Sequence, residues 1–436
     1  MIRFATRLQR FLPKSKLGRN VAVLAGGTAI GQGLVVLASP LLTRLYTPED
    51  FGVLAVYISI LGIVVVVASL RYEMSIPLPE SEETAANVLI LCLTIVLGVS
   101  LLTFLGIWFF IDQIIDWTNV KALRQYLWLL PISILGTGNY QIFSYWAIRQ
   151  RAFSRIARTK LSQSLALVVT QVSFGILGFG AIGLLLGQLL SHVTGTTTLA
   201  KLAWQNSRRT LNTVSLTSVL QVARRYKRFP LLSSGSAILD SLGSQIPILL
   251  LSAFYEPQVA GFLALGQRVV GLPSSLVGSA VAQVYLGESA RIAYDNPEKL
   301  LPFFLRTVKS QLLIGFPVII LLSLPAPWTF PIVFGKNWAD AGLYVQVLFP
   351  MFFLGFISSP MGATLDVLER QDLHLIREVT KIFMVTGAIV LSNHINKNPL
   401  TTITFFGIAI SIVYILNLFL AWYAIKKWSL YRAKKS

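Results

Sequence analysis

The chain has 436 residues, of which 54% are hydrophobic and only 13% are charged. Together with a positive mean hydropathy, this composition excludes an ordinary soluble globular protein and indicates a polytopic membrane protein. The formal net charge of +19 would suit nucleic acid, but the positions of the bases follow membrane topology instead, so no nucleic-acid partner is expected.

Windows of roughly 20 apolar residues, the length that crosses a bilayer core as a helix, recur along the whole chain. They predict an all-α polytopic membrane protein with about twelve transmembrane helices. The predicted spans are residues 20–43, 51–72, 86–111, 126–147, 161–178, 181–200, 231–251, 259–284, 310–328, 341–364, 376–394 and 400–424. The first span is long enough to cross the membrane and has no clear cleavage site, so we expect it to be retained and not to be a signal peptide.

Six spans precede a long basic stretch and six follow it. We therefore predict an N-terminal six-helix lobe over residues 1–200, a basic cytoplasmic linker over 201–230 and a C-terminal six-helix lobe over 231–436. Most of the 37 Lys and Arg residues fall in the loops on one side of the membrane, and this bias places both termini in the cytoplasm. The bases outside that pattern are Arg44, Lys121, Arg124, Lys336, Lys397 and Arg268.

The first hairpin recurs in the second half of the chain. A shift of 209 residues lays span 1, its turn and span 2 on spans 7 and 8. Identical pairs include Gly26 with Gly235, Tyr46 with Tyr255, Pro48 with Pro257 and Gly52 with Gly261. Because each repeat has an even number of spans, we predict two parallel six-helix bundles related by a pseudo-twofold axis along the membrane normal.

Spans 7 and 8 each carry one full charge near the middle, Asp240 in the first and Arg268 in the second. An ionisable side chain at that depth is costly unless it is paired or wetted, so both mark a pairing site, a cavity or a ligand path. No other Asp, Glu, Lys or Arg is expected in mid-membrane. The counterparts under the shift, Gly31 and Ser59, are uncharged, so charge-dependent work is expected in the second bundle.

The sequence shows few features that would indicate an enzyme. Cys92 is the only cysteine and the three histidines are scattered, so neither a disulfide framework nor a metal centre is expected. The predicted outside loops are too short for a catalytic domain, and no loop is long enough for a nucleotide-sugar domain. We expect no catalytic residue, no metal and no cofactor.

Several motifs resemble the Wzx-like polysaccharide biosynthesis flippases, the oligosaccharide flippase branch of the multidrug/oligosaccharidyl-lipid/polysaccharide exporter superfamily. The resemblance extends over almost the whole chain in consistent order. The motifs are Leu42-Thr43-Arg44, Pro48-Glu49-Asp50-Phe51-Gly52, Arg71-Tyr72-Glu73, Ile76-Pro77-Leu78-Pro79, Gln141-Ile142-Phe143-Ser144-Tyr145-Trp146-Ala147-Ile148-Arg149, Phe334-Gly335 with Trp338, Ile357-Ser358-Ser359-Pro360 and Leu368-Glu369-Arg370-Gln371.

This resemblance implies a bacterial inner-membrane flippase that moves undecaprenyl-pyrophosphate-linked oligosaccharide repeat units by alternating access, for O-antigen, capsule or exopolysaccharide. It implies no enzymatic activity. The implied partners are the lipid-linked substrate, membrane lipids, a polysaccharide polymerase and a chain-length regulator, and we expect a monomer. A proton or sodium ion is the expected coupling ion.

A pyrophosphate substrate requires fixed cations, and a guanidinium binds phosphate oxygens in a bidentate manner. We therefore predict that Arg268 binds the phosphates, with Arg44 and Arg71 extending a cationic path. The alternatives for Arg268 are a structural ion pair with Asp240 and a position near a lobe end. Asp240 is the candidate ion-coupling group, since burial raises a carboxyl pKa and a nearby cation lowers it; pairing alone is the alternative.

Intramembrane amides are candidates to line a path for sugar hydroxyls, and Gln32, Gln245 and Gln267 are assigned to the substrate site. Such amides also join helices by hydrogen bonds, which is the expected use of most of them. Arg71 with Glu73 is expected to form an ion pair at a gate.

Two other functions compete with this one. A cation-coupled exporter of the multidrug-extrusion type would need net negative charge in its cavity, whereas here one acid and one base cancel. A membrane glycan polymerase or ligase would usually have a large outward loop, which the predicted spans do not leave room for.

Overall fold

The computed structural model describes residues 16–211 and 214–433, and that part of the chain contains helices and no β-strand. Helices are what long apolar segments require, because in hydrocarbon only intrahelical hydrogen bonds satisfy every backbone N–H and C=O group. The predicted all-α class is confirmed. Some bases used to predict the topology lie outside the described residues, namely Arg3, Arg7, Arg10, Lys14, Lys434 and Lys435.

The chain forms two compact units. Unit 1 comprises Met1–Leu45, Ile60–Ile114 and Ala122–Ile238, and unit 2 comprises Tyr46–Ser59, Ile115–Lys121 and Leu239–Ser436. The turn and first helical turns of the first predicted hairpin therefore group with the C-terminal half of the chain. The predicted lobe boundaries at residues 200 and 231 stay predictions.

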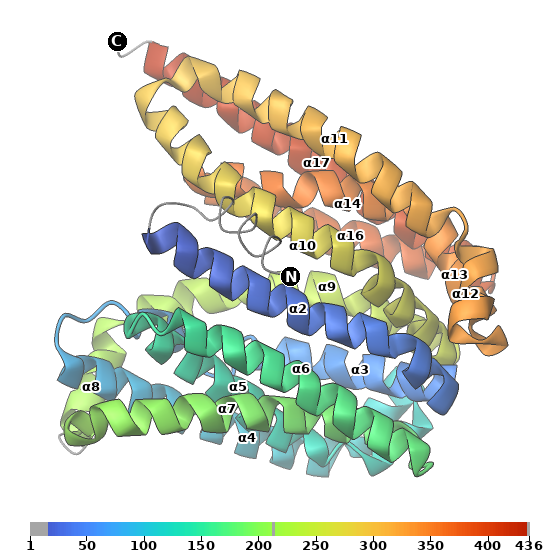
Figure 1. The fold of residues 1–436 in the computed structure, drawn as a ribbon, viewed down its shortest axis with the longest axis horizontal. Coiled ribbons are helices and arrows are strands. Elements are labelled where there is room, and N and C mark those ends of the chain that lie inside the picture. Colours follow the sequence, from blue (N-terminus) through green and yellow to red (C-terminus); the bar gives the residue numbers. More distant parts are fainter. Residues whose placement is uncertain (1–15, 212–213, 434–436) are drawn as a thin grey trace, which may run out of the picture. The chain divides into compact units, whose positions relative to one another are not determined.

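Unit 1 is a bundle of long helices, labelled in Figure 1. They are α2 (Lys16–Leu45), the end of α3 (Pro48–Val65), α4 (Glu82–Thr118), α5 (Leu129–Arg149), α6 (Phe153–Ile176), α7 (Ala181–Leu211) and the short α8 (Leu216–Arg225). Helix α6 packs against both α2 and α7, and α5 packs against α7.

Small residues allow α2 to lie close to α6. A Cβ atom added to Gly27 would lie 2.8 Å from the Cβ of Ala157, and one added to Gly31 would lie 2.7 Å from the Oγ of Ser164. Real Cβ atoms do not approach other atoms so closely; at Gly27 the backbone of Ala157 also lies within 3.0 Å, so a larger residue there would push the helices apart, whereas at Gly31 the Ser164 hydroxyl would have to move. Small residues in span 1 thus permit a close helix contact.

Arg149 joins two of the sequence motifs within unit 1. From the end of α5, its Nη1 donates hydrogen bonds to the carbonyls of Pro79 at 2.6 Å and Ile76 at 3.4 Å. Its Nε lies 3.4 Å from a carboxylate oxygen of Glu82 at the start of α4. The loop before α4 is thus fixed to α5 by one planar side chain, a geometry that a lysine cannot reproduce.

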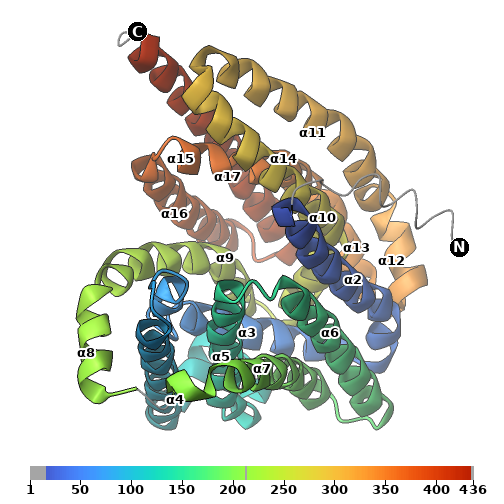
Figure 2. The same ribbon diagram turned by 60° about the vertical axis from the view of Figure 1, so that its left-hand side comes forward.

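Unit 2 contains the remaining helices, seen from a second direction in Figure 2. They are α9 (Ser234–Phe254), which begins in unit 1, α10 (Pro257–Asp295), α11 (Leu300–Ser323), α12 (Ala326–Phe334), α13 (Ala339–Val347), α14 (Phe349–Met361), α15 (Ala363–Val367), α16 (Gln371–Ile395) and α17 (Pro399–Ala433). Helix α17 packs against α16 and α14, and α14 packs against α10.

The predicted span at 341–364 is not one straight helix. It is divided between α13 and α14, and the segments Lys336–Val347 and Phe349–Val367 are bent by 56° relative to each other. The break falls at Leu348, directly before a Phe-Pro pair. Pro350 has no N–H with which to continue the α13 helix, and proline is well tolerated in the first turn of a new helix, where it lies in α14.

Among the described residues, six helices are long and apolar enough to cross a membrane, and a seventh span results if the bent pair counts as one. The six are Gly26–Leu45, Pro48–Val65, Glu82–Thr118, Phe229–Phe254, Pro297–Ser323 and Pro399–Leu430. The predicted total of twelve spans in two bundles stays a prediction.

The internal repeat appears in unit 2 as a reciprocal contact between α3 and α10. A Cβ atom added to Gly52 would lie 2.0 Å from the carbonyl oxygen of Pro257, and one added to Gly261 would lie 2.2 Å from the carbonyl oxygen of Pro48. The 209-residue shift pairs Gly52 with Gly261 and Pro48 with Pro257. Both members of each pair therefore make the same contact; the twofold axis relating the repeats stays a prediction.

Candidate functional site

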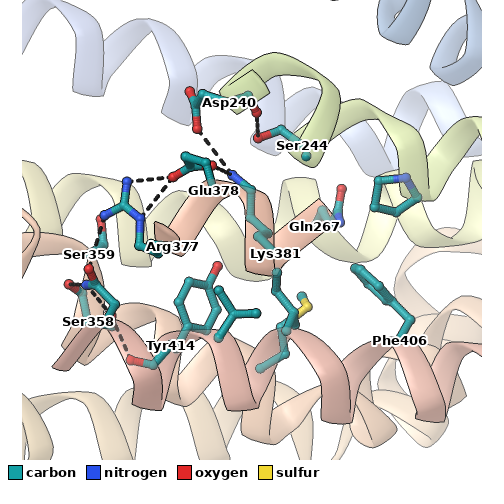
Figure 3. A pocket seen from close by; sticks show the side chains of 16 residues that line it. Asp240, Ser244, Gln267, Ser358, Ser359, Arg377, Glu378, Lys381, Phe406 and Tyr414 are labelled. Carbon is teal, nitrogen blue, oxygen red and sulfur yellow. Dashed lines mark hydrogen bonds and ion pairs between the residues drawn. The ribbon is translucent and has the colours of Figure 1, made fainter. Parts of the chain in front are cut away.

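Unit 2 contains a polar cavity of about 450 Å³ between α9, α10, α14, α16 and α17 (Figure 3). We call it the charged cavity. Its lining residues are Asp240, Gly243, Ser244, Pro247, Gln267, Met351, Ser358, Ser359, Arg377, Glu378, Lys381, Phe406, Ile410, Val413, Tyr414 and Asn417. The lining thus brings two acids and two bases together among helices that are otherwise apolar.

Helix α16 supplies three of these charges. Glu378 accepts from Arg377 on one side, at 2.6 Å from Nη2 and 2.9 Å from Nε, and from Lys381 on the other, at 2.5 Å from Nζ. The two bases are four residues apart, so they project from the same face of the helix. Glu378 and Lys381 have side chains only 10% and 13% exposed, so their charges are compensated mainly by each other and by Arg377.

Asp240 on α9 completes the charged series. Its carboxylate oxygen accepts from the Nζ of Lys381 at 3.2 Å, although 66% of its side chain is exposed. Gly243, one turn further along α9, leaves room for the lysine, because a Cβ atom there would lie 2.3 Å from the Cε of Lys381. Lys381 therefore lies across α9 and bridges two carboxylates from different helices.

The network continues on the other side toward α17 and α14. Arg377 donates from Nη1 to the Oδ1 of Asn417 at 3.1 Å. The amide nitrogen of Asn417 donates to the Oγ of Ser358 at 2.8 Å, and that hydroxyl donates to the carbonyl of Tyr414 at 3.2 Å. Figure 3 shows this continuous line of contacts from Asp240 to Tyr414.

The motif before α16 sets where that helix begins. Glu369 adopts a left-handed backbone conformation with φ 54°. Arg370 then donates two hydrogen bonds to Asp372, from Nε at 2.8 Å and from Nη2 at 2.6 Å. This bidentate contact lowers the pKa of Asp372 to about 2 and keeps a negative charge in the first turn of α16, where the helix dipole favours it.

Lys381 and Glu378 lie well inside α16, and Lys381 contacts Asp240 directly, so a second base and a second acid lie beside the charge predicted in mid-membrane. That only Asp240 and Arg268 are charged in mid-membrane stays a prediction. The sequence prediction assigned Arg377 and Lys381 to the cytoplasmic end of their span, because the apolar run begins at that point. A glutamate between two lysine or arginine residues on one helix face was the signal available in the sequence.

Arg268 on α10 does not line the charged cavity, and its neighbour Gln267 does. The Arg268 guanidinium lies 5.7 Å from the centroid of the Phe51 ring, and its Nη1 is buried without a hydrogen-bond partner among the described residues. The alternative of an ion pair with Asp240 is wrong, because the partner of Asp240 is Lys381. A buried, unpaired guanidinium nitrogen is a donor available to an anion.

The other predicted site residues are divided between the units. Gln245 in unit 2 is partly buried and lies outside the charged cavity. In unit 1, Gln32 and Arg44 are exposed on α2. The Arg71 and Glu73 side chains form the expected ion pair at 3.9 Å; Glu73 is buried and also accepts from Ser69. Whether this pair belongs to a gate stays a prediction.

One intramembrane glutamine, Gln171, has the helix-joining use expected of most of them, and a second, Gln188, makes a contact within its own helix. Gln171 on α6 donates to the carbonyl of Leu184 on α7 at 3.0 Å. Gln188 lies 3.2 Å from His192 one turn further along α7. The Gln171 contact joins α6 to α7 within unit 1.

The fold matches transporters of known structure. The chain superimposes with a TM-score of 0.71 on an inward-facing MATE-family multidrug resistance transporter of the MOP superfamily, at 17% identity over 94% of this chain and 99% of that one. It superimposes with a TM-score of 0.69 on the lipid II flippase MurJ in an inward closed conformation, at 14% identity over 93% of this chain and 90% of that one. At such low identity these similarities define the fold class alone.

The chain belongs to the polysaccharide biosynthesis protein family, whose profile matches residues 41–342, more than half of its length. This confirms the resemblance predicted from the motifs. Lipopolysaccharide biosynthesis protein WzxC of Escherichia coli (strain K12) is 24% identical over 417 residues, 95% of this chain and 81% of WzxC.

Succinoglycan biosynthesis transport protein ExoT of Rhizobium meliloti (strain 1021) is 26% identical over 316 residues, 71% of this chain and 60% of ExoT. Teichuronic acid biosynthesis protein TuaB of Bacillus subtilis (strain 168) is 23% identical over 247 residues, 56% of this chain and 50% of TuaB. The alignments with ExoT and TuaB thus span less than two thirds of those relatives.

Proposed function

We propose that this protein is a non-enzymatic flippase that moves undecaprenyl-pyrophosphate-linked oligosaccharide repeat units across the bacterial inner membrane by alternating access. The glycan would be an O-antigen, capsule or exopolysaccharide unit. The main observation in support of the proposal is the charged cavity. The chain also belongs to the polysaccharide biosynthesis protein family. Charges are retained inside apolar helices at a considerable cost in free energy, and they usually mark the path of a polar substrate.

The charged cavity suits an anionic head group through exchange of partners. In the structure, Arg377 and Lys381 are neutralised by Glu378 and Asp240. A diphosphate has several oxygens that can replace a carboxylate as the acceptor for both bases, and a guanidinium binds them in a bidentate manner. Arg268 would add a further cation, since its Nη1 has no partner among the described residues.

Asp240 is the proposed coupling residue. Its carboxylate is the most exposed member of the network, and it is held to Lys381 by a single contact of 3.2 Å. A proton or a sodium ion would compete with Lys381 for this carboxylate. Binding of the ion would then release the lysine to the substrate, so that ion and substrate occupancy become linked.

The cellular setting follows from the same proposal. Both termini would lie in the cytoplasm, and the protein would act as a monomer beside a polysaccharide polymerase and a chain-length regulator. Membrane lipids would surround it, and the lipid-linked oligosaccharide would be its substrate. Arg44, Arg71, Gln32, Gln245 and Gln267 remain proposed contacts along the substrate path.

The test is complementation of a bacterial strain that lacks its own flippase but makes a lipid-linked repeat unit. Expression of this chain should restore surface polysaccharide and remove the lipid-linked precursor that accumulates in the inner leaflet. The leaflet is established by the access of a membrane-impermeant lectin or periodate to the sugar in spheroplasts. Unchanged accumulation in strains making O-antigen, capsule and exopolysaccharide units would contradict the proposal.

A cation-coupled multidrug exporter is the second candidate, favoured by the MATE-family fold. The charge argument against it persists in the structure, since two acids and two bases cancel in the charged cavity. Efflux of a cationic dye from the same cells, with no restoration of polysaccharide, would establish this candidate instead.

A further inference from the structure

A second cavity, of about 780 Å³, lies at the end of unit 2 where α10, α13 and α17 begin. We call it the end cavity. Its lining residues are Pro48, Asn119, Phe254, Tyr255, Glu256, Gln258, Val259, Phe262, Asn337, Asp340, Tyr344, Lys397 and Pro399. None of these residues lines the charged cavity, and no ligand-binding role has been assigned to them above.

The floor of the end cavity is aromatic and firmly held. The rings of Phe262 and Tyr344 meet edge to face with centroids 5.9 Å apart, and Phe262 makes a similar contact with Trp338. Tyr255 is fixed by a hydrogen bond of 2.7 Å between its hydroxyl and that of Thr402. Phe262 and Tyr344 are only 6% and 5% exposed, so they form a firm base at the bottom of the cavity, and the partly buried Tyr255 ring provides apolar surface whose position is already fixed.

The rim is polar and available to a ligand. Asn337, Asp340 and Lys397 are exposed, and among the described residues their side chains form no hydrogen bond or ion pair. Glu256, also exposed, accepts from Gln258. The rim therefore offers amide, carboxylate and ammonium groups above an aromatic floor, with two acids against one base.

These features select the chemical class of the ligand. The excess of acid disfavours a diphosphate or the head group of an anionic lipid. A saccharide has hydroxyl groups around its edge and apolar C–H groups on its faces, so it matches a polar rim above aromatic rings. We propose that the end cavity binds the sugar portion of the substrate, and this rests on the proposed flippase function.

Its place in the transport cycle follows from topology. The turns at 252–258 and 396–399 are on the extracytoplasmic side in the predicted arrangement, because the cytoplasmic bases lie in the alternate loops. The end cavity would thus receive the oligosaccharide as it leaves the membrane, while the charged cavity holds the pyrophosphate. Sugar recognition and phosphate recognition would be separate sites within unit 2.

The experiment measures binding of the free oligosaccharide, released by mild acid from the lipid-linked precursor that the flippase-deficient strain accumulates, to the full-length protein in lipid nanodiscs. Saturation-transfer NMR detects even millimolar binding. The double variant Asn337→Ala/Lys397→Ala should raise the Kd about tenfold, as expected for two lost hydrogen bonds. The matched control, Asn396→Ala/Lys336→Ala, removes one amide and one base from the same two turns outside the lining, and should leave the Kd unchanged.

The outcomes separate this inference from the proposed function. A protein that restores surface polysaccharide but gives no saturation transfer from the oligosaccharide would overturn the end cavity as a sugar site and leave the flippase intact. Equal Kd values for the wild type and the double variant would do the same. Failure of complementation with retained oligosaccharide binding would instead contradict the flippase alone. Inorganic pyrophosphate, added as a competitor, should not displace the sugar.

Discussion

Lys381 is the residue on which the charged network depends, because among the described residues it is the one that bridges α9 and α16 through charge. It lies 3.2 Å from Asp240 and 2.5 Å from Glu378 and is 13% exposed. A buried network of this kind is not in itself a source of stability, since replacing all its members by apolar groups is often neutral. Removing a single member destabilises the protein, because the remaining buried charge loses its partner.

We therefore expect Lys381→Met and Glu378→Gln each to lower the free energy of unfolding by about 1–3 kcal/mol. In the double variant, the loss in the free energy of unfolding should be smaller than the sum of the two single losses. The difference should exceed about 0.5 kcal/mol. Thermal unfolding in detergent, followed by tryptophan fluorescence, measures both. As a control, the exposed pair of Glu288 and Arg291 on α10 should show almost no coupling. Additive effects at Glu378 and Lys381 would mean that the two charges do not interact.

Arg268 tests whether a cation outside the charged cavity contributes to transport. Its guanidinium is stacked against Phe51 and keeps one Nη without a partner among the described residues. Arg268→Ala should abolish complementation at normal membrane expression. Arg268→Lys should rescue only partly, because an ammonium group cannot bind phosphate in a bidentate manner. Arg291→Ala, on the exposed end of the same helix, is the control, and full activity of Arg268→Ala would remove that residue from the substrate path.

The sequence could identify two of these charges and not the rest. Asp240 and Arg268 stand alone in long apolar runs, so their positions were recognisable from hydropathy. Arg377, Glu378 and Lys381 lie where an apolar run begins, and a span boundary drawn by hydropathy moves them to the membrane surface. Their role depends on how far α16 extends before its apolar part, and that is decided by the turn at Glu369 and Arg370, which hydropathy does not detect.

At the scale of helices, α3 and α10 approach each other closely through two glycines. Each glycine of this contact faces a backbone carbonyl of the other helix, at Gly52 with Pro257 and at Gly261 with Pro48. A backbone atom cannot move aside by changing a rotamer, so a methyl group at either position has to separate the helices.

Gly261→Ala should therefore destabilise the protein by about 1–3 kcal/mol, the usual cost of overpacking. Gly271→Ala on the same helix meets nothing within 4 Å and should be neutral or stabilising by up to about 1 kcal/mol, because alanine is the better helix former. Shifts of opposite sign in the midpoint of thermal unfolding would support the contact. Equal behaviour of the two variants would show that the helices are not closely packed at Gly261.

The sequence predicts most helices of this fold but not their interruptions. Hydropathy identifies the segment around 341–364 as one span, while the Phe349-Pro350 pair divides it and bends it by 56°. The motif around Arg149 was recognised only by resemblance, and its physical reason lies in the carbonyls of Ile76 and Pro79, some 70 residues earlier in the chain. Contacts between residues so far apart in the chain produce no periodic pattern of hydrophobic residues, so the sequence pattern does not reveal them.

At the scale of the whole chain, the two copies of the repeat share a backbone contact but do not share their charged residues. The shift relates Asp240 to Gly31 and Arg268 to Ser59. Gly31 is used for close packing, where a Cβ would lie 2.7 Å from the hydroxyl of Ser164, and Ser59 is fully buried. The charged cavity accordingly belongs to unit 2, and any ion that couples transport to a gradient is expected to act there.

Replacing Asp240 tests this expectation directly, in proteoliposomes that contain the lipid-linked precursor. Asp240→Asn keeps the size of the side chain but holds Lys381 less firmly and cannot bind a proton or sodium ion as a carboxylate does. Substrate binding should be retained, and the dependence of flipping on a proton or sodium gradient should be lost. The control Asp295→Asn, an exposed acid at the end of α10, should keep that dependence. If Asp240→Asn responds to the gradient as the wild type does, the coupling group is another residue, and Glu378, already bonded to both bases of the network, becomes the next one to replace.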